Sequence, residues 1–284
     1  MAKADEELVN AINNVLNNGF LDENPRPKYS DGTPAHTLSV NHVSRVYDIG
    51  RGEFPITSLR RIAWKTAIKE ILWIYQDADN TFDTLHNKYN IKYWDLWESK
   101  KAPGTIGARY GEVVKRYGLM EKLLDELKKD PFGRRHIIDL YQYKELEETD
   151  GLYPCAFLTI WNVRKENGEL YLDLSLIQRS GDLLTASCSG VNEIQYAALL
   201  MMVAHHCGFM VGGMHHFVAN EQIYDRHIPE ALDIVSRFKS NHNILCPKLK
   251  FCPIKSDFYS YTINDFIMED YNPIEPNLQL DLGI

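Results

Sequence analysis

The stretch that decides the fold runs from Cys155 to Asp182 and reads CAFLTIWNVRKENGELYLDLSLIQRSGD. Residues 170 to 176 alternate strictly between leucine and other side chains, which is typical of a half-buried strand. Residues 155 to 163 form a second extended run, and Glu166-Asn167-Gly168 is a turn sequence between the two. The stretch therefore predicts an antiparallel hairpin whose open end brings Cys155 and Arg179 back together.

The two residues at that open end suggest covalent chemistry on a phosphorylated substrate. A nucleophilic cysteine must react as the thiolate, and a neighbouring guanidinium should lower the thiol pKa. The same guanidinium can hold a phosphate through two parallel hydrogen bonds. An arbitrary cysteine is more often a buried core thiol, but Pro154 before Cys155 and Arg179 after it favour the catalytic interpretation.

A second pair of guanidinium groups lies at Gly133-Arg134-Arg135-His136, where a strand-like run, residues 136 to 141, begins. Adjacent side chains of an extended segment point to opposite faces. Arg134 and Arg135 can therefore share one ligand only at a bend, unless one of them serves another subunit. Taken alone the pair would usually be a solvated surface feature.

Composition narrows the class of protein. The chain has 284 residues with 44% hydrophobic content, enough for a sizeable core, and we expect one domain over residues 1–284. The net charge of −8 disfavours broad adhesion to nucleic acid, so no DNA partner is expected. A small phosphate ester fits the local cluster of arginines better than a polymer does.

The sequence also predicts a cytoplasmic protein with reduced cysteines. Its start is charged, and its longest apolar run, Tyr196 to Ala204, is too short to span a bilayer. The five cysteines are an odd number at irregular spacings, which argues against a disulfide framework.

Helices and strands are expected throughout the rest of the chain, in an α/β or α+β arrangement around a mixed sheet. Apolar periodicity and turn residues predict helices over residues 4–18, 59–75, 120–129, 191–207 and 229–238, and further extended segments over 37–48 and 215–224.

Five motifs in this order resemble the thymidylate synthase family: GRR at 133–135, LYPC at 152–155, QRSGD at 178–182, Asn192-x-x-x-Tyr196 and QIY at 222–224. The resemblance extends over nearly the whole chain. It includes Arg26 before Asp31-Gly32-Thr33, Glu70 before Leu72-Trp73, Trp94-Asp95-x-Trp97, Gly107-x-x-Tyr110-Gly111 and the short C-terminal tail.

The resemblance implies a thymidylate synthase-like fold, a mixed β-sheet with flanking helices, whose sheet face forms a homodimer interface. It implies the reductive methylation of dUMP by 5,10-methylenetetrahydrofolate, which yields dTMP and dihydrofolate. The folate is a co-substrate, and no metal is expected. Arg134 and Arg135 would be donated across the interface to the partner's site.

The resemblance also implies roles for individual residues. Cys155 would add to C6 of the pyrimidine, Glu70 and Tyr110 would organise proton transfers, and Asn192 would read the uracil edge. The nucleotide site would comprise Arg26, Arg134, Arg135, Gln178, Arg179, Ser180, Asp182, Asn192, Gln222 and Tyr224. The folate site would comprise Trp94, Trp97, Leu152, Asp182, Leu282 and Gly283, the last two closing over both ligands.

Three positions depart from the common family pattern. Gln222 and Ala156 stand where many members carry His, and the segment from Thr185 to Val191 is about two residues longer and lacks a Pro-Phe pair. At the longer segment the residues available for local folate contacts therefore differ from the common pattern.

Alternative functions remain open at this point. A deoxypyrimidine nucleotide hydroxymethylase on the same scaffold is the nearest, motivated by the unusual segment Ser187-Cys188-Ser189-Gly190. A non-catalytic nucleotide- or RNA-binding relative is another. The histidines and cysteine at 205–207 and 215–216 lack the spacing of known zinc sites.

Overall fold

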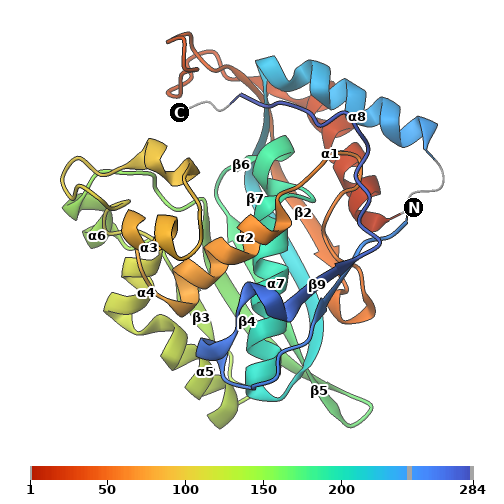
Figure 1. Ribbon diagram of the computed structural model, residues 1–284. Coiled ribbons are helices and arrows are strands. Elements are labelled where there is room, and N and C mark those ends of the chain that lie inside the picture. The colour runs from red at the N-terminus through yellow and green to blue at the C-terminus, as the bar shows by residue number, and fades with distance from the viewer. Residues whose placement is uncertain (1, 242–244, 282–284) are drawn as a thin grey trace.

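The computed structural model describes residues 2–241 and 245–281 and has helices gathered in front of one extended sheet (Figure 1). The helices are α1 (Lys3–Asn18), α2 (Trp64–Ile71), α3 (Phe82–Asn87), α4 (Gly111–Tyr117), α5 (Leu119–Lys129), α6 (Tyr143–Glu148), α7 (Val191–Cys207) and α8 (Ile228–Ser240). The strands are β1 (Phe20–Leu21), β2 (Thr37–Tyr47), β3 (Ile137–Asp139), β4 (Ala156–Glu166), β5 (Glu169–Gln178), β6 (Gly181–Asp182), β7 (Met210–Tyr224), β8 (Lys248–Phe251) and β9 (Phe266–Glu269).

The main sheet is mixed, as predicted. Its strand order is β1-β2-β7-β5-β4-β3, with β6 added beside β7. Strand β7 runs parallel to β5 and β6, and the other neighbours are antiparallel. Strands β8 and β9 form a separate two-stranded sheet.

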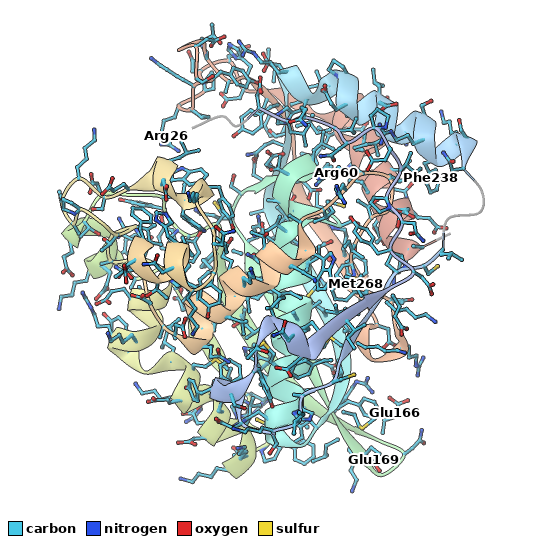
Figure 2. All side chains as sticks on the ribbon, viewed as in Figure 1. Arg26, Arg60, Glu166, Glu169, Phe238 and Met268 are labelled. Atoms are coloured by element: carbon cyan, nitrogen blue, oxygen red, sulfur yellow. The ribbon has the colours of Figure 1, made fainter. Side chains whose placement is uncertain are left out.

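The predicted hairpin is confirmed as β4 and β5. Asn167 and Gly168 form its turn with φ angles of 52° and 92°, the left-handed conformation that an Asn-Gly pair adopts in two-residue hairpin turns. Glu166 and Glu169 mark this closed end at one extremity of the molecule, and Arg26 lies at the opposite extremity (Figure 2). Cys155 and Arg179 lie at the open end of the hairpin.

Helix α7 covers one face of the sheet, and α2 crosses it in front (Figure 1). From Leu172 to Gln178, every second residue of β5 points to this covered face and is buried, and the residues between them are half-buried on the other face. On that outer face Leu158, Ile177 and Phe217 are neighbours across three strands. The outer face therefore presents apolar side chains that the helices of this chain leave partly exposed.

The helix predicted over residues 59–75 was wrong at its start, whereas its predicted end agrees with the end of the helical segment to within one residue. Helix α2 begins only at Trp64, and residues 72–76 form a π-helical turn. Tertiary contacts explain the late start. The Leu59 carbonyl accepts a hydrogen bond from Arg237 (3.1 Å), and the Ile62 N–H donates to the Tyr271 hydroxyl (2.6 Å). The strand predicted over 136–141 is shorter, and the one over 215–224 begins earlier, at Met210.

The remaining predicted helices agree with the structure to within one or two residues. Gly208, at a φ of 75°, ends α7 in the left-handed conformation that favours glycine. The five cysteines are free thiols. Over residues 2–241 and 245–281 we find no helix with the length and hydropathy needed to traverse a bilayer, and no group of three or more side chains suited to hold a metal ion.

Candidate active site

A cavity of about 1190 Å³ opens beside the open end of the β4–β5 hairpin. Its walls come from the loop before β2, the segment before β4, the ends of β5 and β7, and the start of α7. Most of the predicted site residues line it: Arg26, Trp97, Leu152, Cys155, Gln178, Arg179, Ser180, Asp182, Asn192, Gln222 and Tyr224.

Cys155 and Arg179 meet at the rim of the hairpin. The Arg179 N–H donates to the Cys155 carbonyl oxygen at 2.9 Å, and Nη2 of Arg179 lies 3.5 Å from the Cys155 Sγ. The Arg179 guanidinium also donates to the carbonyl groups of Pro154 and Tyr153, both at 2.9 Å. These contacts hold a positive charge beside the sulfur.

The pKa of the Cys155 thiol is nevertheless raised above its ordinary value. Burial is the largest cause, and it outweighs the opposing charges of Arg179 and Arg26. The guanidinium of Arg179 therefore acts on the thiol pKa as predicted, but burial, which the prediction did not include, has the larger effect. Sγ lies 3.8 Å from the Tyr153 carbonyl, an acceptor for a thiol S–H.

Tyr110 lies behind Cys155 in a rarely populated backbone conformation. Its hydroxyl oxygen accepts a long hydrogen bond from the Cys155 N–H, at 3.4 Å. Its φ of 45° is uncommon for a residue with a side chain, and such conformations concentrate at functional sites. The next residue, Gly111, packs so closely that a Cβ there would lie 2.0 Å from the Asp79 carbonyl oxygen. This close packing restrains the backbone next to Tyr110, at the start of α4.

Glu70 is buried on α2, with 6% of its surface exposed. Burial raises the pKa of Glu70 to about 7, and the side chains of Gln195 and Trp94 offset part of this effect. Trp94 is itself buried and packs edge-on against Tyr110 and Trp97, with ring centroids 5.4 and 5.5 Å away. Glu70 and Trp94 thus belong to the buried layer that supports the cavity, and of the predicted tryptophans it is Trp97 that lines the cavity.

The Asn192 carboxamide is fixed from two sides. Its Oδ1 accepts a hydrogen bond from Nε2 of Gln178 at 3.1 Å, and its Nδ2 donates to Oε1 of Gln195 at 3.1 Å. Gln178 is buried at the end of β5, and its Nε2 also donates to the Ser180 carbonyl at 2.9 Å. A side chain that presents both a donor and an acceptor is therefore held at the cavity wall in one orientation.

Three further predicted residues hold the rim between β5 and β7. Ser180 Oγ lies 3.4 Å from the Gln222 carboxamide. Gln222 precedes Tyr224 by two residues on β7. The Asp182 carboxylate accepts hydrogen bonds from the N–H groups of Leu184 and Thr185 and from the Thr185 hydroxyl. Asp182 therefore shapes the first turn of the unusual segment that follows it.

The unusual segment folds inward. Thr185 and Ala186 line the cavity, whereas Ser187, Cys188 and Ser189 are fully buried. The Ser187 hydroxyl donates to Glu221 and the Ser189 N–H donates to Glu193, at 2.7 and 2.6 Å. The additional residues thus serve a buried polar cluster.

Arg134 and Arg135 are exposed on the segment before the edge strand β3. Among the described residues, the basic side chains that line the cavity are Arg26 and Arg179 alone. Leu282 and Gly283 lie outside the described residues.

Sequence reasoning missed several residues of this region. Ser39, Tyr141, Tyr153 and Asn220 also line the cavity. A cluster behind it contains Arg45, Glu193, His216 and Glu221, all buried. One signal could have revealed the cluster, because these are ionisable side chains at positions where α7 and the two strands otherwise bury apolar residues.

Comparisons with known proteins agree with the geometry. The sequence profile of the family described as thymidylate synthase matches residues 6–283. Thymidylate synthases of Streptococcus pneumoniae (strain 70585) and Streptococcus sanguinis (strain SK36) are 46% and 44% identical to this chain over the full length of both proteins. A solved structure of thermostable thymidylate synthase A from Bacillus subtilis superposes with a TM-score of 0.87 at 33% identity, covering 99% of each chain.

Proposed function

Because the chain belongs to the thymidylate synthase family, we propose that Cys155 is the nucleophile of its reaction. The protein is a methyltransferase that converts dUMP to dTMP with 5,10-methylenetetrahydrofolate, which becomes dihydrofolate. The observation that carries the proposal is the meeting of Cys155, Arg179 and Asn192 at one cavity, with the buried Tyr110 hydroxyl in contact with the Cys155 N–H.

Cys155 provides covalent activation of the pyrimidine. Addition of its thiolate to C6 breaks the C5–C6 double bond and places an electron pair on C5, which attacks the one-carbon unit. Arg179, 3.5 Å from the sulfur, favours the thiolate against the effect of burial. A phosphate ester bound to the same guanidinium delivers the base to the thiol.

Glu70 and Tyr110 handle protons. A carboxyl group with a pKa of about 7 is close to half-ionised at neutral pH, so Glu70 can both give and take a proton. Burial raises the pKa of Tyr110, so its hydroxyl stays protonated and acts as a hydrogen-bond donor or acceptor beside Cys155.

Asn192 reads the base while its neighbours hold the sugar and phosphate. Uracil presents an N3–H donor beside its O4 acceptor, and a carboxamide can pair with both. Arg26, Arg179 and Ser180 line the part of the cavity suited to the phosphate, and Gln222 and Tyr224 line the part suited to the sugar.

The cavity is large enough for the folate as well as the nucleotide. Its volume of about 1190 Å³ exceeds the range typical of a site for one small ligand, roughly 300–1000 Å³. Trp97 and Leu152 provide apolar wall, and Asp182 provides a carboxylate. When bound, the folate supplies the one-carbon unit and the hydride that reduces it. Walls drawn from segments far apart in the sequence support one domain over residues 1–284.

A homodimer completes the site. The half-buried Leu158, Ile177 and Phe217 make the outer sheet face suitable for a second copy of the chain. Arg134 and Arg135 are exposed, so a partner's cavity can receive their guanidinium groups. Two more positive charges would hold a phosphate dianion that Arg26 and Arg179 share.

Mixing two inactive variants tests the shared site. Cys155→Ala and the double variant Arg134→Ala/Arg135→Ala should each be inactive alone. After random subunit exchange half of the dimers are hybrids, and each hybrid has one intact site of two, so activity should return to about one quarter of wild type. Activity that stays near zero while mass spectrometry shows hybrid dimers would contradict donation across the interface.

A direct test of the nucleophile uses Cys155→Ala by itself. Turnover should disappear while dUMP binding, measured by calorimetry, stays within about tenfold, because the phosphate and base contacts remain. Undiminished turnover would exclude the thiol role.

The hydroxymethylase alternative loses its motivation in the structure. The segment that suggested it is buried at Ser187, Cys188 and Ser189, and it contacts Glu193 and Glu221. Product analysis separates the two reactions, because a methylase oxidises the folate to dihydrofolate and a hydroxymethylase releases tetrahydrofolate.

A further inference from the structure

A buried cluster of four ionisable side chains lies behind the cavity. Arg45 comes from β2, Glu193 from α7, and His216 and Glu221 from β7. Each is 3% exposed or less. Nε of Arg45 donates to Glu193 at 2.8 Å, and its two terminal nitrogens donate to the Glu221 carboxylate at 2.9 and 2.7 Å.

The charges of the cluster balance only if His216 is a cation. One guanidinium faces two carboxylates, and Glu193 is ionised: burial opposes its ionisation, but the direct contact with Arg45 at 2.8 Å favours the charged form and its pKa lies below the ordinary value. A net buried negative charge is costly in a protein interior. A positive charge on His216 would bring the sum to zero.

The hydrogen bonds of His216 also require the protonated, cationic ring. Nδ1 lies 2.9 Å from Oε1 of Glu193, and Nε2 lies 3.0 Å from Oε1 of Gln178. A carboxylate can only accept. The Gln178 oxygen is also fixed toward the ring, because its Nε2 must donate to the Ser180 backbone carbonyl. Both ring nitrogens therefore face acceptors, and both must carry a hydrogen.

The same series of hydrogen bonds continues from Gln178 to Asn192, the residue proposed to read the base. Nε2 of Gln178 donates to Oδ1 of Asn192, so the Asn192 oxygen is held on one side and its NH₂ group on the other. A carboxamide rotated by 180° would present its donor where its acceptor stood. It would then match N3 and the amino group of cytosine, because cytosine reverses the uracil pattern.

We propose that His216 and Glu193 are positioning residues for base selectivity: His216, held as an imidazolium by Glu193, fixes Gln178 and through it the Asn192 carboxamide in the orientation that reads uracil. This inference rests on the proposed role of Asn192. Arg45 and Glu221 complete the charge balance. The polar segment Ser187–Ser189 closes the cluster.

The test compares two variants that touch the same carboxylate. His216→Gln removes the cation beside Glu193 Oε1, and glutamine cannot reproduce both of the hydrogen bonds that the ring donates, to Glu193 and to Gln178. Tyr47→Phe removes only the hydroxyl that donates to Glu193 Oε2 at 3.1 Å. The ratio of dUMP to dCMP affinity, measured by calorimetry, should fall by roughly 10- to 100-fold in His216→Gln and stay within about twofold in Tyr47→Phe. An unchanged ratio in folded His216→Gln overturns the inference.

Two further measurements distinguish a failure of this inference from a failure of the proposed role of Asn192 and from a variant that does not fold. If Asn192→Asp leaves the selectivity unchanged, the base-reading role of Asn192 fails and the inference fails with it; if only His216→Gln is without effect, the inference alone fails. Nitrogen NMR of the wild-type protein with labelled histidine tests the imidazolium even if a variant does not fold. Two protonated ring nitrogens at neutral pH support the inference, and one unprotonated nitrogen overturns it.

Discussion

Two buried carboxyl groups, Glu70 on α2 and Glu193 on α7, flank the same asparagine and behave in opposite ways. Burial raises the pKa of Glu70 to about 7, because its neighbours Gln195 and Trp94 carry no charge. Burial acts on Glu193 too, but Arg45 and His216 hold its pKa at about 2. Burial alone therefore does not decide the ionisation of a carboxyl group, since its partners can reverse the effect.

The two groups differ in function for the same reason. The Glu70 carboxyl group can gain or lose a proton near neutral pH, which suits a role in acid–base catalysis. Glu193 keeps a fixed charge over the working range and can only orient its partners. Asn192 hydrogen-bonds on one side to Gln195, a neighbour of Glu70, and on the other to Gln178, which His216 connects to Glu193.

The largest expected change in stability comes from Glu193→Ala. Removing this carboxylate leaves Arg45 and His216 buried with excess positive charge, and the free energy of unfolding should fall by about 3–5 kcal/mol. Urea denaturation at pH 7 measures this. Glu169→Ala, on the exposed hairpin turn, is the control and should change stability by less than about 0.5 kcal/mol. A loss below about 1 kcal/mol for Glu193→Ala would show that the cluster is not a fixed charge network.

Glu70→Gln should raise the free energy of unfolding, whereas Glu193→Ala lowers it. Below pH 4.5 the carboxyl is protonated in both states, so its raised pKa costs nothing. Between pH 4.5 and 7 the unfolded chain ionises and the folded protein does not, so stability declines as pH rises and levels off above 7. The neutral glutamine avoids this loss, and the variant should be more stable by about 1 kcal/mol at pH 5 and about 3 kcal/mol at pH 8.

The same variant should lose turnover by roughly 10²- to 10⁴-fold, because glutamine cannot exchange the proton. Denaturation curves at the two pH values and steady-state rates together check the prediction. A variant that gains stability equally at both pH values would mean that Glu70 does not titrate near neutrality.

Tyr47→Phe should have the smallest effect. It removes one hydrogen bond from an uncharged hydroxyl to the Glu193 carboxylate and leaves both cationic partners in place, so the free energy of unfolding should fall by about 1.5 kcal/mol. Thermal denaturation measures the shift. A loss as large as that of Glu193→Ala would indicate that the hydroxyl, rather than the charges, stabilises the carboxylate.

The sequence predicted the hairpin because its signals are local. Strict alternation in β5 and the Asn167-Gly168 turn need no distant partner, and they place Cys155 beside Arg179. The start of α2 could not be predicted in this way, because Arg237 and Tyr271, far along the chain, hold residues 59 to 62 out of the helix.

The candidate site shows the same contrast between features with local sequence signals and features that depend on distant contacts. Motif order indicated the cavity residues, but the net pKa of Cys155 depends on burial that a sequence does not display. The cluster of Arg45, Glu193 and His216 was missed because its members come from three elements, and the one local signal was an ionisable side chain at a position that the pattern of its helix or strand would bury.

The central claim, that Cys155 attacks the pyrimidine in the presence of the folate, has one direct measurement. Fluorine at C5 cannot leave as a proton does, so 5-fluorodeoxyuridylate with 5,10-methylenetetrahydrofolate should stop the reaction at its covalent stage. Intact-protein mass spectrometry should then show the mass of both ligands added to the chain, and peptide mapping should place them on Cys155. A folded, dimeric protein whose mass is unchanged, or an adduct on another residue, would contradict this account.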